Sequence, residues 1–355
     1  LKIPRPDIAH YLEARREQGF NAIQGPILVG LTGNNFNEAP KNPTLNDFRR
    51  DHVGNLPFKS LDPIQLNDAY WETVDFIVQQ ASQRGFQILP AMAWGSTADI
   101  VFRSPAQAAQ YAAAVASRYR SYPNVHWIVL GEYQKIAWER RPGDRKIPNA
   151  YELSIVNAMG RAAQENNNPE ALVTIHPDGA KSTSSLHGQP WLDFNTVQSW
   201  NNVASTVTLA LSDFAREPPK PTILAETVYE DAKVNPVLGT AWDMRRYAYG
   251  SAFAGSAGFT YGHWNVWQFG TRDNRGRWKE NIDEPGARQI AGPFRALMNT
   301  FHTSDRRPAN DLVTFGSTTP GSHGYVGATQ SHLGGYIMVY SASGSSFDVN
   351  TRSLG

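Results

Sequence analysis

Short apolar runs alternate along the chain with amphipathic stretches of helical spacing, from residue 7 to about residue 301. Apolar residues that recur every three or four positions indicate helices, whereas short bounded apolar runs indicate buried strands. Helices are therefore predicted at residues 7–19, 67–85, 105–120, 151–166, from about 203, 241–253 and 285–301. Strands are predicted at residues 20–29, 86–94, 125–132, 171–176, 194–200, 222–226 and 258–264.

The alternation of these elements defines the fold class. Strands separated by crossover helices form a parallel sheet. Seven strands with a helix before the first predict an α/β fold, a (β/α)8 TIM barrel whose first strand is missing from the sequence. Such a barrel would have an unsealed edge. An open doubly wound sheet is the alternative, but no predicted strand is followed by a Gly-rich dinucleotide-binding turn.

Two regions depart from the alternation. Residues 31–66 are rich in Asn and Pro and predict a long loop, which is a candidate for forming part of a site. Residues 304–355 are rich in Ser, Thr and Gly, with short alternating strands such as YIMVY. We therefore predict a catalytic domain at residues 1–303 and the start of a small β-sandwich module at residues 304–355.

Two predicted strands end on a glutamate, Glu132 after the fourth strand of the barrel and Glu226 after the seventh. The active site of a (β/α) barrel lies at the C-terminal ends of its strands. Either glutamate alone could cap a helix or form a salt bridge. Together they predict glycosidic cleavage, in which one carboxyl protonates the leaving oxygen and the other attacks or stabilises the anomeric carbon.

The remaining strand ends carry polar side chains interleaved with aromatic rings. Flat rings pack against the CH-rich faces of sugars, so this pattern favours a carbohydrate site. The predicted substrate-binding residues are Gln24, Trp94, His176, Asp178, Gln198, Trp200, Tyr229, Tyr261, His263, Trp264 and Trp267. Trp71 and Trp127 lie within a helix and a strand, and we expect them to pack in the core.

Composition and charge exclude several other classes of function. The chain has 41% hydrophobic and 18% charged residues and a net charge of +1, which is typical of a globular protein. No run of Lys and Arg suggests a nucleic-acid partner, and no apolar run is long enough to span a membrane. The absence of cysteine excludes disulfides, thiolate metal sites and a cysteine nucleophile.

Two other functions remain open at this point. A metal-dependent barrel hydrolase is supported only by His176 and His263, so we expect no metal and no cofactor. A non-catalytic glycan-binding barrel would bind sugar without turnover. A phosphate-handling barrel is disfavoured, because TVYEDAKV and a Trp- and His-rich turn replace the Gly-rich phosphate loops.

Several stretches carry a resemblance that spans almost the whole chain: YLEARREQGFNAIQ, NDAYWETVDFIV, RYRSYPNVHWIVLGE, TIHPDG, WLDFNTVQSW, KPTILAETVYE and RRYAYGSAFAGSAGFTYGHWNVWQ. The chain resembles the apiosidase-like glycoside hydrolases, whose catalytic barrel precedes a β-sandwich of the collagen-binding type. The tail YIMVYSASGSSFDVN is similar to the first strands of that sandwich.

The resemblance implies a retaining hydrolase of plant or microbial polysaccharides or oligosaccharides, secreted or periplasmic. It implies that Glu132 is the acid/base and Glu226 the nucleophile. The chain departs from the family at Leu130-Gly131-Glu132, where Gly-Gly-Asp is more frequent, so a longer carboxylate arm alters the expected gap between the pair. The family's first strand, which ends in Asp-Thr-x-Trp, has no counterpart in the sequence.

Overall fold

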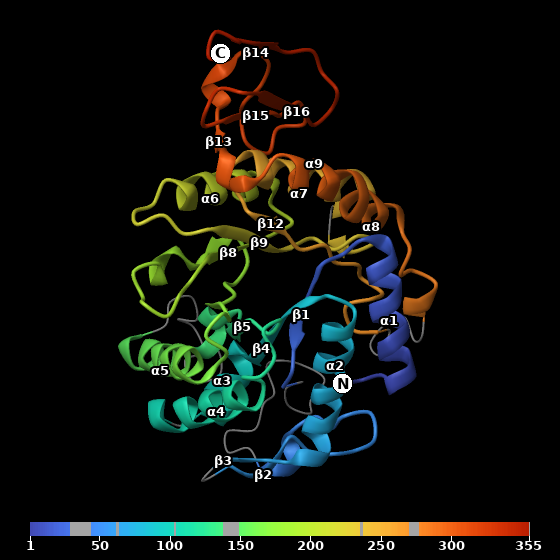
Figure 1. The fold of residues 1–355 in the computed structure, drawn as a ribbon, viewed down its shortest axis with the longest axis vertical. Coiled ribbons are helices and arrows are strands. Elements are labelled where there is room, and N and C mark those ends of the chain that lie inside the picture. The colour runs from blue at the N-terminus through green and yellow to red at the C-terminus, as the bar shows by residue number, and fades with distance from the viewer. Residues whose placement is uncertain are drawn as a thin grey trace. The chain divides into compact units, whose positions relative to one another are not determined.

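The computed structural model of the protein describes residues 1–28, 44–61, 64–102, 104–137, 149–234, 237–269 and 277–354 (Figure 1). Residues 31–43 and 62–63 of the loop predicted at residues 31–66 lie outside these ranges. The chain divides into two compact units, described here one at a time. The first unit contains Leu1–Asp178 and Leu186–Asp193, and the second contains Gly179–Ser185 and Phe194–Gly355.

The first unit is built on a four-stranded sheet in which every described pairing is parallel. In sheet order the strands are β1 (Ala22–Pro26), β4 (Gln87–Trp94), β5 (Trp127–Gly131) and β6 (Val173–Thr174). All five residues of β5 are buried, as expected for a central strand with both faces covered. The buried Trp127 on β5 and Trp71 confirm the prediction that these two indoles pack in the core.

Helices precede or follow each of these strands. The predicted ones are α1 (Arg5–Gln18), α2 (Asp68–Gln83), α4 (Pro105–Arg118) and α5 (Ala150–Asn166). Helix α1 ends where Gly19 adopts a left-handed conformation with φ of 104°, which glycine tolerates at little cost. The helix begins at Arg5, two residues before the predicted start at Asp7, and its N-cap is Pro4.

Some short elements of the first unit were not predicted. Helix α3 (Gly95–Val101) begins directly after β4, and the hairpin of β2 (Phe58–Leu61) and β3 (Ile64–Leu66) lies within the predicted long loop. These elements are too short to show a repeating spacing of apolar residues in the sequence.

The second unit contains a second sheet, with the order β12-β9-β8-β7. Strands β8 (Asn195–Trp200), β9 (Thr222–Thr227) and β12 (Gly258–Phe259) are parallel, and β7 (Lys181–Ser182) is antiparallel to β8. A short hairpin, β10 (Lys233–Val234) and β11 (Val237–Leu238), follows β9.

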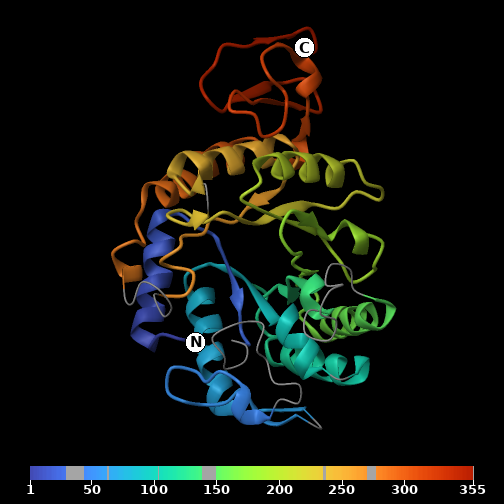
Figure 2. The same ribbon diagram turned by 180° about the vertical axis from the view of Figure 1, so that it is seen from behind.

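The helices of this unit are α6 (Val203–Phe214), α7 (Ala241–Phe253), α8 (Pro285–Gln289) and α9 (Arg295–Thr300) (Figure 2). A π-helical turn at Ile290–Phe294, which contains Pro293, joins α8 to α9. The single helix predicted at residues 285–301 is therefore interrupted, because proline cannot donate the regular helical hydrogen bond. The protein has an α/β fold with parallel strands and intervening helices.

Residues after 304 form two small antiparallel sheets. Strands β13 (Arg306–Pro308), β15 (Val326–Ser331) and β16 (Ile337–Ser341) make one, and β14 (Val313–Phe315) and β17 (Asp348–Val349) make the other. The boundary at residue 303 and the sandwich architecture remain predictions.

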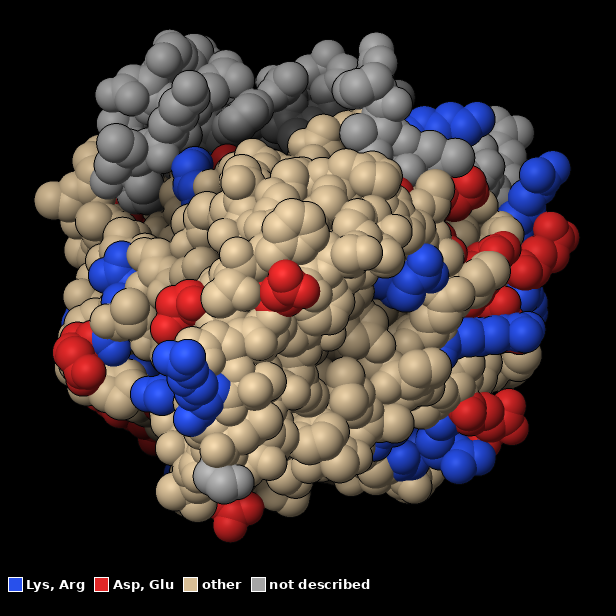
Figure 3. Space-filling view, turned by 90° about the horizontal axis from the view of Figure 1, so that it is seen from above, with Lys and Arg blue, Asp and Glu red and all other residues tan. Residues whose placement is uncertain are grey.

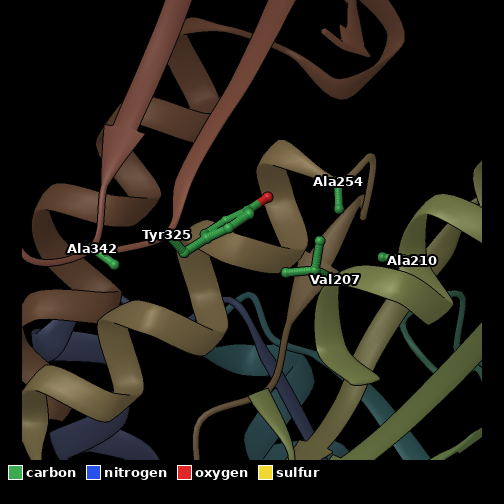
Figure 4. Close-up of a cluster of buried hydrophobic side chains, with 5 residues drawn as sticks. All are labelled: Val207, Ala210, Ala254, Tyr325 and Ala342. Carbon is green, nitrogen blue, oxygen red and sulfur yellow. The ribbon is translucent and has the colours of Figure 1, made fainter. Parts of the chain in front are cut away.

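An apolar cluster joins this β region to α6 and α7 within the second unit (Figure 4). Its members are Val207, Ala210, Ala254, Tyr325 and Ala342. The Tyr325 ring points from the β region toward the helices, where the others lie near it. The β region is therefore held by buried apolar contacts.

Neighbouring contacts extend the same interface. The rings of Tyr249 on α7 and Tyr340 on β16 stack at 4.8 Å with an interplanar angle of 10°. Trp242 Nε1 donates a hydrogen bond of 3.0 Å to the Ala342 carbonyl oxygen.

Charged groups are interspersed on the face drawn in Figure 3, where Lys and Arg alternate with Asp and Glu. No helix in the described part of the chain is long and apolar enough to cross a membrane.

Replacing Tyr325 by Ala should lower the free energy of unfolding by about 3 kcal/mol, because it removes a buried ring and leaves a cavity against α6 and α7. Chemical denaturation monitored by circular dichroism measures the change. Phe315→Ala is the matched control, since this ring is 60% exposed, and it should change stability by no more than about 0.5 kcal/mol. Equal effects of the two substitutions would contradict the interface.

Candidate active site

Glu132 follows β5 directly and has a left-handed backbone, with φ of 45°. This conformation is costly for a residue with a side chain, and such strain is concentrated at functional sites. Two glycines make the geometry possible. A Cβ on Gly131 would overlap the Trp94 indole, and one on Gly95 would overlap the Glu132 carbonyl oxygen.

Two donors hold the Glu132 carboxylate. Trp94 Nε1 donates to Oε2 at 2.8 Å, and Lys135 Nζ lies 2.5 Å from the same oxygen. Lys135 also lies 3.6 Å from Asp178 Oδ1, so the ammonium bridges two acidic side chains.

His176 is buried next to Trp94, with an exposed fraction of only 2%. Its ring centroid is 5.7 Å from that of Trp94, and Nδ1 lies 2.9 Å from the Pro177 carbonyl oxygen. Burial lowers the pKa of His176, and the nearby Glu132 charge opposes the shift only in part. The imidazole is therefore neutral near pH 7.

Asp178 and Gln24 have different positions in the first unit. The backbone N–H of Asp178 donates to Gln134 Oε1 at 2.7 Å, which fixes the turn after His176. Gln24 is half-buried on β1 and is paired in register with Leu89 of β4. The role of each in binding remains a prediction. We call Trp94, Glu132, Lys135, His176 and Asp178 the Glu132 cluster.

Glu226 lies on β9 of the second unit, with Gln198 of β8 as its partner in register. The pairing of β8 with β9 is irregular on both sides of Gln198, and Trp200 at the end of β8 has φ of 50°. Bulges of this kind redirect side chains near active sites. Gln198 is 3% exposed, whereas Trp200 and Glu226 are half-buried.

Tyr229 is the centre of the aromatic group around Glu226. Its hydroxyl donates to Glu226 Oε1 at 2.5 Å. Its ring centroid lies 5.9 Å from Trp200, 5.7 Å from Trp267 and 6.5 Å from Trp264. We call Gln198, Trp200, Glu226, Tyr229, Trp264 and Trp267 the Glu226 cluster.

Glycines again allow the close approach. A Cβ on Gly262 would overlap the Tyr229 ring, and one on Gly239 would overlap the Tyr229 carbonyl oxygen. The ring that supports Glu226 is therefore fixed by packing on the backbone of the loop after β12.

Tyr261 and His263 belong to that loop. The Tyr261 hydroxyl donates to Glu230 Oε2 at 2.5 Å, and the backbone N–H of Asn265 donates to His263 Nδ1 at 3.0 Å. His263 is 2% exposed, and its role in binding remains a prediction. Trp267, by contrast, is 41% exposed.

The structure thus gathers most predicted site residues into two clusters, one in each unit. His176 and His263, which suggested a metal-dependent enzyme, lie in different units. In the ranges that the structure describes, no three His, Asp or Glu residues are grouped as a metal site. Lys135, Gln134, Glu230 and Asn265 were missed by the sequence analysis, because none of them ends a predicted strand.

Carboxyl groups at the C-terminal ends of parallel strands are what glycosidic cleavage requires. The chain belongs to the apiosidase-like family: residues 1–304 match the model of the apiosidase-like catalytic domain. The protein is therefore a glycosidase. This excludes the alternative of a non-catalytic glycan-binding barrel. A search of curated proteins found no match.

Solved structures show the same fold. A glycoside hydrolase is 24% identical with a TM-score of 0.76, over 96% of this chain and 76% of the other. A glycoside hydrolase family 5 protein from Bacteroides vulgatus ATCC 8482 is 23% identical with a TM-score of 0.81, over 100% and 76%. An endo-1,4-β-D-mannanase from Thermotoga petrophila RKU-1 is 15% identical with a TM-score of 0.52, over 81% and 95%. At these identities the likeness extends to the fold alone.

Gly131→Ala should reduce glycosidase activity by about tenfold or more, because the added methyl displaces the Trp94 indole from Glu132 and misplacement by about 1 Å is costly. The activity of purified protein and the near-ultraviolet circular dichroism of its tryptophans measure the effect. Gly188→Ala is the matched control, since a Cβ there meets no atom within 4 Å. An unchanged Gly131→Ala protein would contradict the packing described.

His176 should make stability depend on pH. The unfolded chain binds a proton at this histidine below about pH 6.5, whereas the folded protein, with its lowered pKa, resists protonation. Stability is therefore retained above about pH 6.5 and is lost as pH falls through the folded pKa. His176→Gln should lose less stability between pH 7.5 and pH 5 than the wild type, measured by thermal unfolding.

The matched control is His10→Gln, because His10 is exposed on α1. The His176→Gln protein should differ from both the wild type and this control. If all three lose the same stability on acidification, the buried imidazole is not the source of the pH dependence.

Proposed function

We propose that the protein hydrolyses O-glycosidic bonds of plant or microbial polysaccharides or oligosaccharides by retaining double displacement. Glu226 is the nucleophile and Glu132 the acid/base, at the mouth of a (β/α)8 barrel. The observation that carries the proposal is that each glutamate, at or just beyond the end of a parallel strand, accepts a hydrogen bond from an aromatic side chain.

The contacts of Glu226 suit a nucleophile. The Tyr229 hydroxyl donates to one carboxylate oxygen and so favours the charged form. In the first step a Glu226 oxygen bonds to the anomeric carbon as the glycosidic C–O bond breaks. In the second step a water oxygen replaces Glu226 at that carbon and releases the sugar.

The contacts of Glu132 suit a group that alternates between acid and base. It gives a proton to the leaving oxygen in the first step and takes one from the attacking water in the second. Trp94 and Lys135 donate to the carboxylate and hold it in position for both steps. We expect the carboxyl groups to lie roughly 5–5.5 Å apart, the separation of retaining enzymes.

The aromatic rings are proposed to bind the sugar. The rings of Trp200, Trp264 and Trp267 with Tyr229, and of Trp94 beside Glu132, offer flat surfaces for CH-rich sugar faces. Hydroxyl contacts are assigned to Gln24, His176, Asp178, Gln198, Tyr261 and His263. A polysaccharide substrate is consistent with a secreted or periplasmic enzyme.

Glu226→Gln should reduce turnover of every substrate to background, because an amide cannot form the glycosyl–enzyme bond. Glu132→Gln should lower kcat/KM by about 10²–10⁴-fold on natural glycosides but spare 4-nitrophenyl glycosides, whose leaving group needs no proton. Steady-state kinetics on both substrate types measure the difference.

Glu170→Gln is the control, since Glu170 is an exposed carboxyl outside both clusters. Substrates come from a screen of plant and microbial polysaccharides, including pectic side chains, with the released sugars identified. Full activity of Glu226→Gln would contradict the assigned nucleophile.

A further inference from the structure

Glu230 is a buried carboxyl with no part in the reaction just described. It follows β9 by three residues and is 6% exposed. Burial raises its pKa, and the hydrogen bonds that it accepts partly offset this effect. A buried charge of this kind is costly unless its partners compensate, so those partners are informative.

The side chain of Glu230 joins two later segments of the chain. Oε2 accepts the hydrogen bond of the Tyr261 hydroxyl at 2.5 Å, and Oε1 accepts that of the Gly286 backbone N–H at 2.9 Å. A Cβ on Gly286 would overlap the Glu230 carboxylate, so the first turn of α8 closes directly over it. One carboxylate thus ties the loop after β12 to the start of α8.

The backbone of Glu230 fixes the same loop. Its N–H donates to the Gly262 carbonyl oxygen at 2.9 Å, and its carbonyl oxygen accepts from the Trp264 N–H at 2.8 Å. These bonds form a parallel bridge between Glu230 and His263, beyond the paired ends of β9 and β12, which lie side by side in Figure 1. The backbone bonds set the position of the loop, and the carboxylate fixes the Tyr261 side chain beside them.

The loop in turn positions the rings of the Glu226 cluster. Gly262 lies against the Tyr229 ring, and Trp264 and Trp267 have ring centroids 6.0 Å apart. Asn265, between them in sequence, donates to Asp231 Oδ2 at 3.3 Å and to Asn281 Oδ1 at 2.9 Å. These links from β9 to the rings therefore pass through residues that flank or contact Glu230.

We propose that Glu230 is a positioning residue for the substrate-binding rings of Trp264 and Trp267, acting on sugar affinity and not on bond cleavage. The proposal rests on the proposed function, in which these rings bind the sugar. The carboxylate is suited to this role because it accepts two hydrogen bonds from different segments at once, which a shorter or apolar side chain cannot do.

The first test needs no substrate. Acrylamide quenching of tryptophan fluorescence is compared between wild type, Glu230→Ala and Glu230→Gln, each also in a Trp264→Phe/Trp267→Phe background. Glu230→Ala should increase quenching, and the increase should vanish in the background that lacks both indoles. Glu230→Gln should restore the wild-type value, because its amide can both accept from Gly286 and donate to the Tyr261 oxygen.

The second test separates binding from chemistry. On the 4-nitrophenyl glycoside that the wild type hydrolyses fastest, Glu230→Ala should raise KM by about tenfold while kcat changes by less than about threefold. Glu230→Gln should recover most of the loss. Glu280→Ala, which removes an exposed carboxyl of the same unit, is the matched control and should leave both constants unchanged.

The outcomes are distinct. A fall in kcat with unchanged KM in Glu230→Ala, or quenching that does not change, overturns the positioning role. If the wild type hydrolyses no glycoside, the proposed function fails, but the quenching comparison still decides whether Glu230 fixes the two indoles. Should Glu230→Ala not fold, Tyr261→Phe provides the same quenching comparison, because it removes the hydrogen bond to the Glu230 carboxylate. A wild-type value in Tyr261→Phe would then overturn the proposal.

Discussion

The packing of an aromatic ring on a glycine is the contact on which both clusters depend. Trp94 lies over Gly131, its register partner on β5, and Tyr229 lies against Gly262. In each case no side chain larger than hydrogen fits beneath the ring, so the ring is fixed at van der Waals distance from the backbone. Each ring then donates one hydrogen bond to a carboxylate, Glu132 or Glu226.

This arrangement explains how flexible glutamates can be held for chemistry. A glutamate side chain has three rotatable bonds, and ordering it costs entropy that a single hydrogen bond offsets only in part. A rigid indole or phenol that is packed against a glycine is already fixed in position. It therefore loses no further conformational entropy when it donates its hydrogen bond to the carboxylate. Pre-organisation of this kind is what a catalytic carboxylate requires.

Glu132 also has a positively charged partner, Lys135. Lys135 lies on the same side as Trp94, against the same oxygen, and reaches Asp178 as well. The buried, neutral His176 lies next to the indole. The Glu132 carboxylate is thus held by an indole N–H and an ammonium group.

The sequence by itself determined the alternation of strands and helices and the placement of Glu132 and Glu226 at strand ends. These features depend on local periodicity and on where apolar runs stop, which neighbouring residues reveal. The sequence missed α3 and the break at Pro293, where short or irregular segments carry too few repeats for a pattern.

Only the tertiary structure decided which groups support the two carboxylates. Trp94 meets Glu132 across 38 positions of sequence, and Gly286 meets Glu230 across 56. Such contacts depend on how strands and loops are brought together, and no spacing within the chain encodes them. For that reason Glu230 looked like an ordinary loop residue in the sequence, whereas in the folded protein it joins three segments of the site.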